Sequence, residues 1–118
     1  MNFSTRKVVN PSNATKIRTT KKLDLDKLAR SVSIAETAWC TKWSAITHKN
    51  CFGIMDYSTW KRRFKKYTTK QDSFKDFKRI WSNYYWGYPD YKKAKRYTGN
   101  DKPKIWLAIV DKHYKLIK

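Results

Sequence analysis

Apolar residues recur three and four positions apart along much of the chain, and this spacing constrains the fold more than any other feature. Between residues 23 and 48 the repeat runs through Leu28, Val32, Ala35, Trp39, Trp43 and Ile46. Spacing of this kind places side chains on one face of an α-helix. Ser33-x-x-Glu36 resembles a capping box, so the helix has a point at which it could restart. The spacing predicts a mainly α-helical fold.

The stretch 57–67 reads YSTWKRRFKKY and predicts a second helix. Its spacing of 3, 4 and 3 would bury one aromatic face made of Tyr57, Trp60, Phe64 and Tyr67. Asp56 is a suitable N-cap for it.

A third helix is predicted to begin after Thr69, where Thr69-x-x-Asp72 is typical of a capping box. Its apolar face would comprise Phe74, Phe77, Trp81 and Tyr84 or Tyr85, and Gly87 and Pro89 would end it.

The C-terminal third is less regular. Residues 87–103 contain the turn signals GYPD and TGNDKP and are predicted to form a loop that carries the basic run YKKAKRY. The segment 104–118 suits a helix, and the alternative is a β-hairpin that turns at Asp111-Lys112.

The chain length of 118 residues is that of one domain. Residues 1–22 lack a lasting period and predict a basic extended arm. Residues 23–118 predict a single helical nucleic-acid-binding domain, with three or four helices around an aromatic core. No apolar run is long enough to span a bilayer.

Positive charge dominates the composition. Lys and Arg number 28 against 9 Asp and Glu, which gives a net charge of +19. A compact body with that charge repels itself unless a polyanion neutralises it, and nucleic acid is the usual one. The stretch from Ser58 to Gln71 contains no acid, so its lysines and arginines gain no pairing within their own helix.

We therefore predict a nucleic-acid interface made of basic side chains from three segments. They are Arg6, Lys7, Lys16, Arg18, Lys21 and Lys22 of the arm, Lys61, Arg62, Arg63, Lys65 and Lys66 of the second helix, and Lys92, Lys93, Lys95 and Arg96 of the loop. Nearby aromatic residues could stack on unpaired bases or pack under the loop, and Tyr85, Trp86 and Tyr88 are the candidates.

Neither a metal site nor a catalytic motif is predicted. Cys40, His48, Cys51 and His113 supply four zinc-type ligands, but their spacing matches no established zinc pattern, and the sequence leaves open whether the two cysteines meet. Phosphate-binding loops and the familiar hydrolase motifs are missing, so the sequence predicts no cofactor and no enzymatic activity.

The leading hypothesis is a structural RNA-binding subunit of a large ribonucleoprotein such as a ribosome, in contact with other proteins of that assembly and with no membrane. RNA is favoured over DNA, in the cytoplasm or a mitochondrion, and secretion is not expected. The first alternative is a DNA-binding protein of phage or plasmid type, with 57–67 as the recognition helix and Thr59, Lys61, Arg62 and Lys65 in the major groove. The second is a small nuclease in which a histidine acts as the base.

Overall fold

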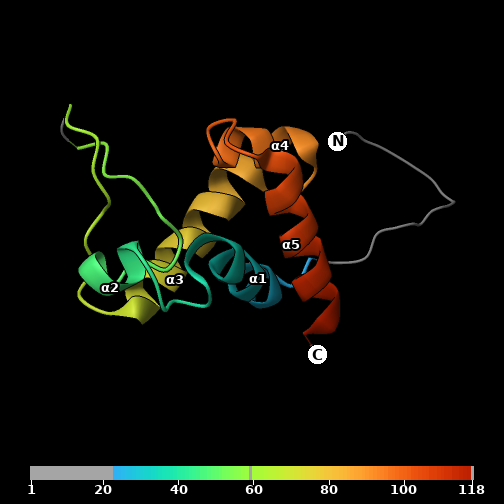
Figure 1. The fold of residues 1–118 in the computed structure, drawn as a ribbon, viewed down its shortest axis with the longest axis horizontal. Helices are drawn as coiled ribbons and strands as arrows, with labels where there is room; N and C mark the ends of the chain where they lie inside the picture. Colours follow the sequence, from blue (N-terminus) through green and yellow to red (C-terminus); the bar gives the residue numbers. More distant parts are fainter. Residues whose placement is uncertain (1–22, 59, 118) are drawn as a thin grey trace, which may run out of the picture.

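The computed structural model describes residues 23–58 and 60–117 and confirms the predicted mainly α-helical fold (Figure 1). Its elements are α1 (Leu25–Thr37), α2 (Ser44–His48), α3 (Lys70–Ile80), the π-helical turn η2 (Trp81–Tyr85), α4 (Tyr91–Tyr97) and α5 (Pro103–Leu116). The predicted arm, 1–22, lies outside the described residues. None of these helices is long and apolar enough to cross a membrane.

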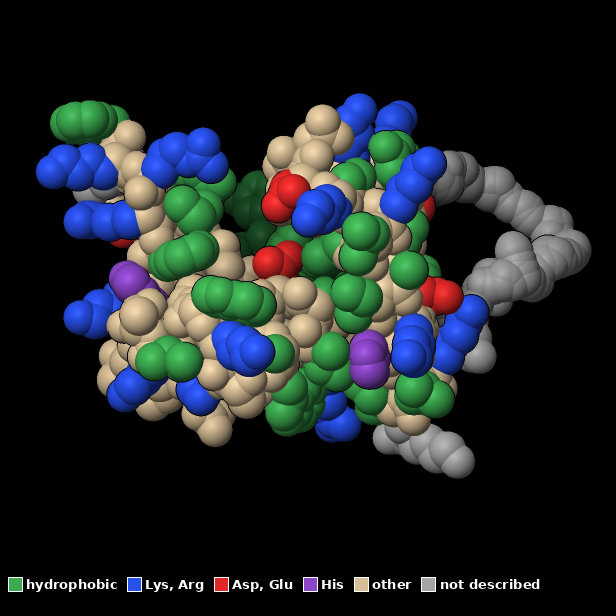
Figure 2. Space-filling model, in the orientation of Figure 1, with side chains coloured by type: hydrophobic (Ala, Val, Ile, Leu, Met, Phe, Trp, Pro, Cys, Tyr) green, Lys and Arg blue, Asp and Glu red, His purple; other side chains and the backbone are tan. Residues whose placement is uncertain are grey.

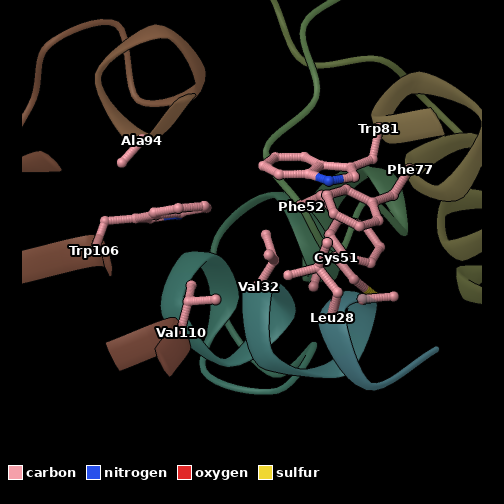
Figure 3. Close-up of a cluster of buried hydrophobic side chains, with 11 residues drawn as sticks. Leu28, Val32, Cys51, Phe52, Phe77, Trp81, Ala94, Trp106 and Val110 are labelled. Atoms are coloured by element: carbon pink, nitrogen blue, oxygen red, sulfur yellow. The ribbon is translucent and has the colours of Figure 1, made fainter. Parts of the chain in front are cut away.

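An aromatic core joins the helices, as the sequence predicted. Helix α1 packs against α5 and α3, and its buried Leu28 and Val32 meet Phe77 and Trp81 in that core (Figure 3). Phe52 stacks on Phe77 with ring centroids 4.5 Å apart.

The third predicted helix is confirmed as α3. Thr69 Oγ1 accepts a hydrogen bond from the Asp72 backbone N–H, and the Asp72 carboxylate accepts one from the Thr69 N–H, which completes the predicted capping box. The helix continues into η2, and Gly87 then takes a φ of +81°, which a residue without a side chain adopts readily.

The predicted helix over 23–48 is interrupted. Helix α1 runs through Ser33 without restarting and ends at Thr37, and its C-cap Ala38 has a φ of +50°. Trp39 and Cys40 also have positive φ. Because of this break, Trp39, Trp43 and Ile46 leave the buried face and are exposed.

The predicted helix over 57–67 is wrong. Residues 54–58 and 60–66 form the two sides of a hairpin instead, which we call the basic hairpin (Figure 1). Asp56 N–H donates to Arg63 O at 2.8 Å, and Lys65 N–H donates to Ile54 O at 2.8 Å. Like charges three and four positions apart destabilise a helix, and the hairpin avoids that repeat. Tyr57 and Trp60, predicted to be buried, are 87% and 90% exposed.

Two corrections concern the C-terminal third. The basic run 91–97 is not a loop but the helix α4, with the Asp90 side chain accepting from the Lys93 backbone N–H as N-cap. The segment after Pro103 is the helix α5, so the alternative β-hairpin is wrong.

A disulfide joins Cys40 to Cys51, so the two cysteines do meet. It closes the loop that connects the end of α1 to the start of the basic hairpin.

Candidate functional site

A groove separates the basic hairpin from the π-helical turn η2, α4 and α5. It has two adjoining parts, of about 500 Å³ and about 730 Å³. Ile54, Met55, Tyr57, Ile80, Tyr85 and Arg96 line both parts. The hollow is visible in Figure 2 between the upper-left lobe, which is the basic hairpin, and the upper-central lobe around α4, with acidic side chains along it.

The smaller part of the groove contains the chain's one glutamate, Glu36, and we call it the Glu36 half. Glu36 lies in the last turn of α1, and its Oε2 accepts a hydrogen bond from Trp106 Nε1 of α5 at 2.8 Å. Oε1 borders the backbone of Gly53, because a Cβ added there would lie 3.5 Å from it. No other described residue forms a hydrogen bond with this carboxyl group.

The surroundings of Glu36 favour its protonated form. Burial is the largest influence and raises the pKa of Glu36 to about 7. The bond from Trp106 opposes this, and the negative charge of Asp101, on the same half of the groove, adds to it. Near neutral pH the carboxyl group is therefore able both to donate and to accept a proton.

A buried polar network sets the position of Glu36 relative to the hairpin. The neighbouring Thr37 donates from Oγ1 to Cys51 O at 2.7 Å, and Ser44 donates from Oγ to Asn50 O at 2.7 Å. The Asn50 side chain donates to Ile54 O and to Lys65 O, at 2.8 and 2.9 Å. The end of α1 and the base of the basic hairpin are thus tied together.

The larger part of the groove, which we call the Asp76 half, is braced by α3. Asp76 accepts hydrogen bonds from Lys65 Nζ at 2.9 Å, from Tyr67 OH and from Arg79. Burial alone would raise the pKa of Asp76, but these three bonds lower it below its ordinary value. Asp76 is therefore a charged anchor for the hairpin.

The basic side chains predicted to bind nucleic acid divide into paired and unpaired groups. Lys65 is bound to Asp76, Arg63 Nε lies 3.9 Å from Asp56, and Lys93 donates to Tyr88 O. Lys61 also has an interaction within the protein. No hydrogen bond or ion pair to another described residue involves the side chains of Arg62, Lys66, Lys92 and Lys95.

The three aromatic candidates lie in different settings. Tyr85 is half-buried: its ring stacks on Trp81 with centroids 4.6 Å apart, and the Arg96 guanidinium lies 4.7 Å from its centre. Tyr88 donates from its hydroxyl to Asp111 at 2.6 Å. Trp86 is 61% exposed and is the most accessible of the three.

The zinc-type ligands are not brought together. Cys40 and Cys51 are bonded to each other, and His48 Nδ1 lies 2.6 Å from its neighbour Thr47 Oγ1. Within residues 23–58 and 60–117, no three His, Cys, Asp or Glu side chains are placed to hold a metal ion.

Sequence reasoning assigned Glu36 only to a capping box and missed its place in the groove. A signal was present, because Glu36 follows Val32 by four positions and so lies on the apolar face of its helix. An acid on a buried face needs a partner, and that partner, Trp106, is 70 residues away in the sequence. Comparison with protein-family models, curated proteins and solved structures gave no significant match.

Proposed function

We propose that the groove is an active site in which Glu36 acts as a general acid. The observation that carries this proposal is the position of Glu36, whose partly buried carboxyl group lines the groove and accepts a hydrogen bond from Trp106. Burial raises its pKa to about 7. General acids work best when their pKa lies near the operating pH, and enzymes raise the pKa of a glutamate to that range by burial. A perturbed carboxyl group in a cleft is a candidate catalytic residue on these grounds.

The bond that suits this site is the glycosidic bond. Its cleavage uses two carboxyl groups. One protonates the leaving oxygen, which is the role proposed for Glu36, and Asp101, in the same half of the groove, is the second. Tyr97 and the largely buried Trp106 line the same half of the groove as Glu36, with their ring centroids 5.3 Å apart. The groove also extends past Glu36 into the Asp76 half, so a polymer can lie along it.

The reaction balances with water as the second substrate. Glu36 gives its proton to the glycosidic oxygen as the bond from that oxygen to the anomeric carbon breaks. A water oxygen then bonds to the anomeric carbon, and a proton from that water returns to the Glu36 carboxylate. The products are two shorter chains, one of which ends in a new reducing sugar.

The test is the release of reducing ends from a panel of glycans: cellulose, chitin, chitosan, hyaluronan and peptidoglycan. The wild type should cleave at least one of them, and Glu36→Gln should reduce the rate about 100-fold or more. Asp26→Asn, which changes an exposed carboxylate on α1 outside the groove, is the matched control and should retain the rate. Failure to cut any of these glycans, or a Glu36→Gln variant with the wild-type rate, would refute the proposal.

A second candidate is binding of nucleic acid, favoured by the unpaired Arg62, Lys66, Lys92 and Lys95 on the basic hairpin and α4. In this proposal the protein is a non-catalytic RNA-binding subunit of a ribonucleoprotein in the cytoplasm or a mitochondrion. RNA affinity should then fall with salt by roughly 0.7 to 0.9 log units per log unit of salt for each phosphate contacted. Lys66→Gln combined with Lys92→Gln should lower that slope, and Glu36→Gln should leave it unchanged. A flat salt response would rule out this candidate.

A further inference from the structure

Arg96 lies where the two halves of the groove meet. It extends from the last turn of α4 and lines both the Glu36 half and the Asp76 half. Any polymer that passes from one half to the other therefore passes this guanidinium group.

The guanidinium is held in place by neighbouring aromatic residues. It lies 4.7 Å from the centre of the Tyr85 ring, and its Nη1 donates to Tyr84 O at 2.9 Å. Tyr85 is itself stacked on the fully buried Trp81. Arginine stacks well on an aromatic face, and a side chain held in this way loses less conformational freedom on binding a ligand.

Most of the hydrogen-bonding capacity of Arg96 is unused. A guanidinium has five N–H donors, and only the bond to Tyr84 engages one of them among the described residues. No carboxylate of the described chain pairs with Arg96. The two acids that line the Asp76 half are engaged elsewhere, Asp76 with Lys65 and Arg79, and Asp56 with Ser58.

We infer that Arg96 is the receptor for a carboxylate carried by the polymer that occupies the groove. The planar fork of a guanidinium matches a carboxylate with two parallel hydrogen bonds. The inference rests on the proposed glycan substrate and narrows its class to glycans that bear carboxylates along the chain. Binding at Arg96 would fix the register of the polymer relative to Glu36, and so determine which glycosidic bond is cut.

Two probes of matched backbone test the inference. One is the β-1,4-linked hexamer of N-acetylglucosamine, which is neutral. The other is the same hexamer with a lactyl ether on every second sugar (N-acetylmuramic acid), which adds carboxylates and leaves the backbone unchanged. Affinities are measured on the full chain carrying Glu36→Gln, so that neither probe is cut during the titration.

The carboxylated hexamer should bind at least tenfold more tightly than the neutral one. Adding Arg96→Gln should remove that preference while the neutral hexamer keeps its affinity within about twofold. Arg96→Lys keeps the positive charge but lacks the paired N–H donors of a guanidinium. It should keep only part of the preference for the carboxylated hexamer. Lys92→Gln also removes one positive charge from α4, but Lys92 does not line the groove. This variant should keep the full preference for the carboxylated hexamer.

Equal affinity for the two probes, no binding of the carboxylated probe, or a preference that survives Arg96→Gln would overturn the inference. A thermal melt of Arg96→Gln that matches the parent would show that the loss is not due to unfolding. Cleavage is measured separately on the wild type. A preference that depends on Arg96 without any cleavage refutes the hydrolase alone, and cleavage without the preference refutes the carboxylate receptor alone.

Discussion

The Nζ of Lys65 lies 2.9 Å from Oδ2 of Asp76, so this lysine of the basic hairpin forms an ion pair with α3. The carboxylate also binds Tyr67 OH and Arg79, and its side chain is only 10% exposed. Asp76 thus connects α3 to Lys65 of the hairpin and to Tyr67, which follows it. These bonds hold that wall of the groove against α3.

Asp76→Asn should therefore destabilise the protein by about 1–3 kcal/mol, because it removes the charge that three donors share. Urea unfolding at pH 7 measures the change. The pKa of Asp76 is depressed in the folded state, so its stabilising contribution is present above the unfolded pKa and is lost as pH falls through the folded pKa. The difference between wild type and Asp76→Asn should therefore shrink in strong acid.

Asp26→Asn is the control, since the Asp26 side chain is 69% exposed and pairs with Lys78 at the surface. It should change the free energy of unfolding by less than about 1 kcal/mol. If Asp76→Asn and Asp26→Asn changed the free energy of unfolding equally, Asp76 would contribute no more to stability than an exposed surface carboxylate.

Glu36 should make the protein less stable as the pH rises. Its folded pKa is about 7, above the ordinary value of 4.5, so the folded state holds a proton that the unfolded state releases between those pH values. Stability from this group is therefore complete below pH 4.5 and is lost as pH rises through about 7. The loss is on the order of 3 kcal/mol at most.

Glu36→Gln should remove this dependence, so that the variant is more stable than the wild type at pH 8 and similar to it at pH 5. Urea unfolding at the two pH values makes the comparison, and the glutamine can still accept the bond from Trp106. The same carboxyl group should make glycan cleavage fall as pH rises above about 7, because the acid form is the active one. A wild type and variant with parallel pH profiles of stability would contradict the burial of Glu36.

Local signals predicted the parts of the fold that local interactions decide. The Thr69 capping box and the apolar face of α3 lie within one helix, and both are confirmed. Helix α4 was missed because Pro89-Asp90 suggested a turn, whereas Asp90 is in fact its N-cap.

The basic hairpin could not be predicted from spacing, because bonds from distant residues determine it. Its base is held by the buried Asn50, which bonds to Ile54 O and, 15 residues away, to Lys65 O. Those tertiary bonds override a helical period that was present in the sequence. The groove could not be predicted from the sequence for the same reason, since α1, the hairpin, α4 and α5 come together only in the folded chain.

The disulfide between Cys40 and Cys51 should stabilise the link between α1 and the hairpin. Its loop spans 11 residues, for which chain entropy gives a contribution of about 2–3 kcal/mol. Dithiothreitol should lower the melting temperature of the wild type, and mass spectrometry after alkylation should show both thiols modified only in the reduced sample. A reducing compartment would keep the bond open.

The double variant Cys40→Ser, Cys51→Ser is the control for this experiment. It should melt at the temperature of the reduced wild type and should not respond to dithiothreitol. Thiols that alkylate fully without reductant, in protein purified under oxidising conditions, would contradict the bond.

Tyr57 and Phe77 should differ sharply in their contributions to stability, although their spacing in the sequence suggests buried helical faces for both. Tyr57 is 87% exposed on the basic hairpin and lines both halves of the groove, whereas Phe77 is fully buried between Phe52 and Trp81. Tyr57→Ala should change the free energy of unfolding by no more than about 0.5 kcal/mol. Phe77→Ala should cost about 3–5 kcal/mol, because it leaves a cavity in the core.

Urea unfolding of the two variants tests this difference in stability. Ligand binding tests whether Tyr57 contributes to the groove. Because Tyr57 contributes a groove wall and not a core contact, Tyr57→Ala should weaken binding of the glycan probes while the melting temperature stays unchanged. A large loss of stability in Tyr57→Ala would mean that 57–67 packs as the helix its spacing suggested, and the hairpin would then form no groove with α4 and α5.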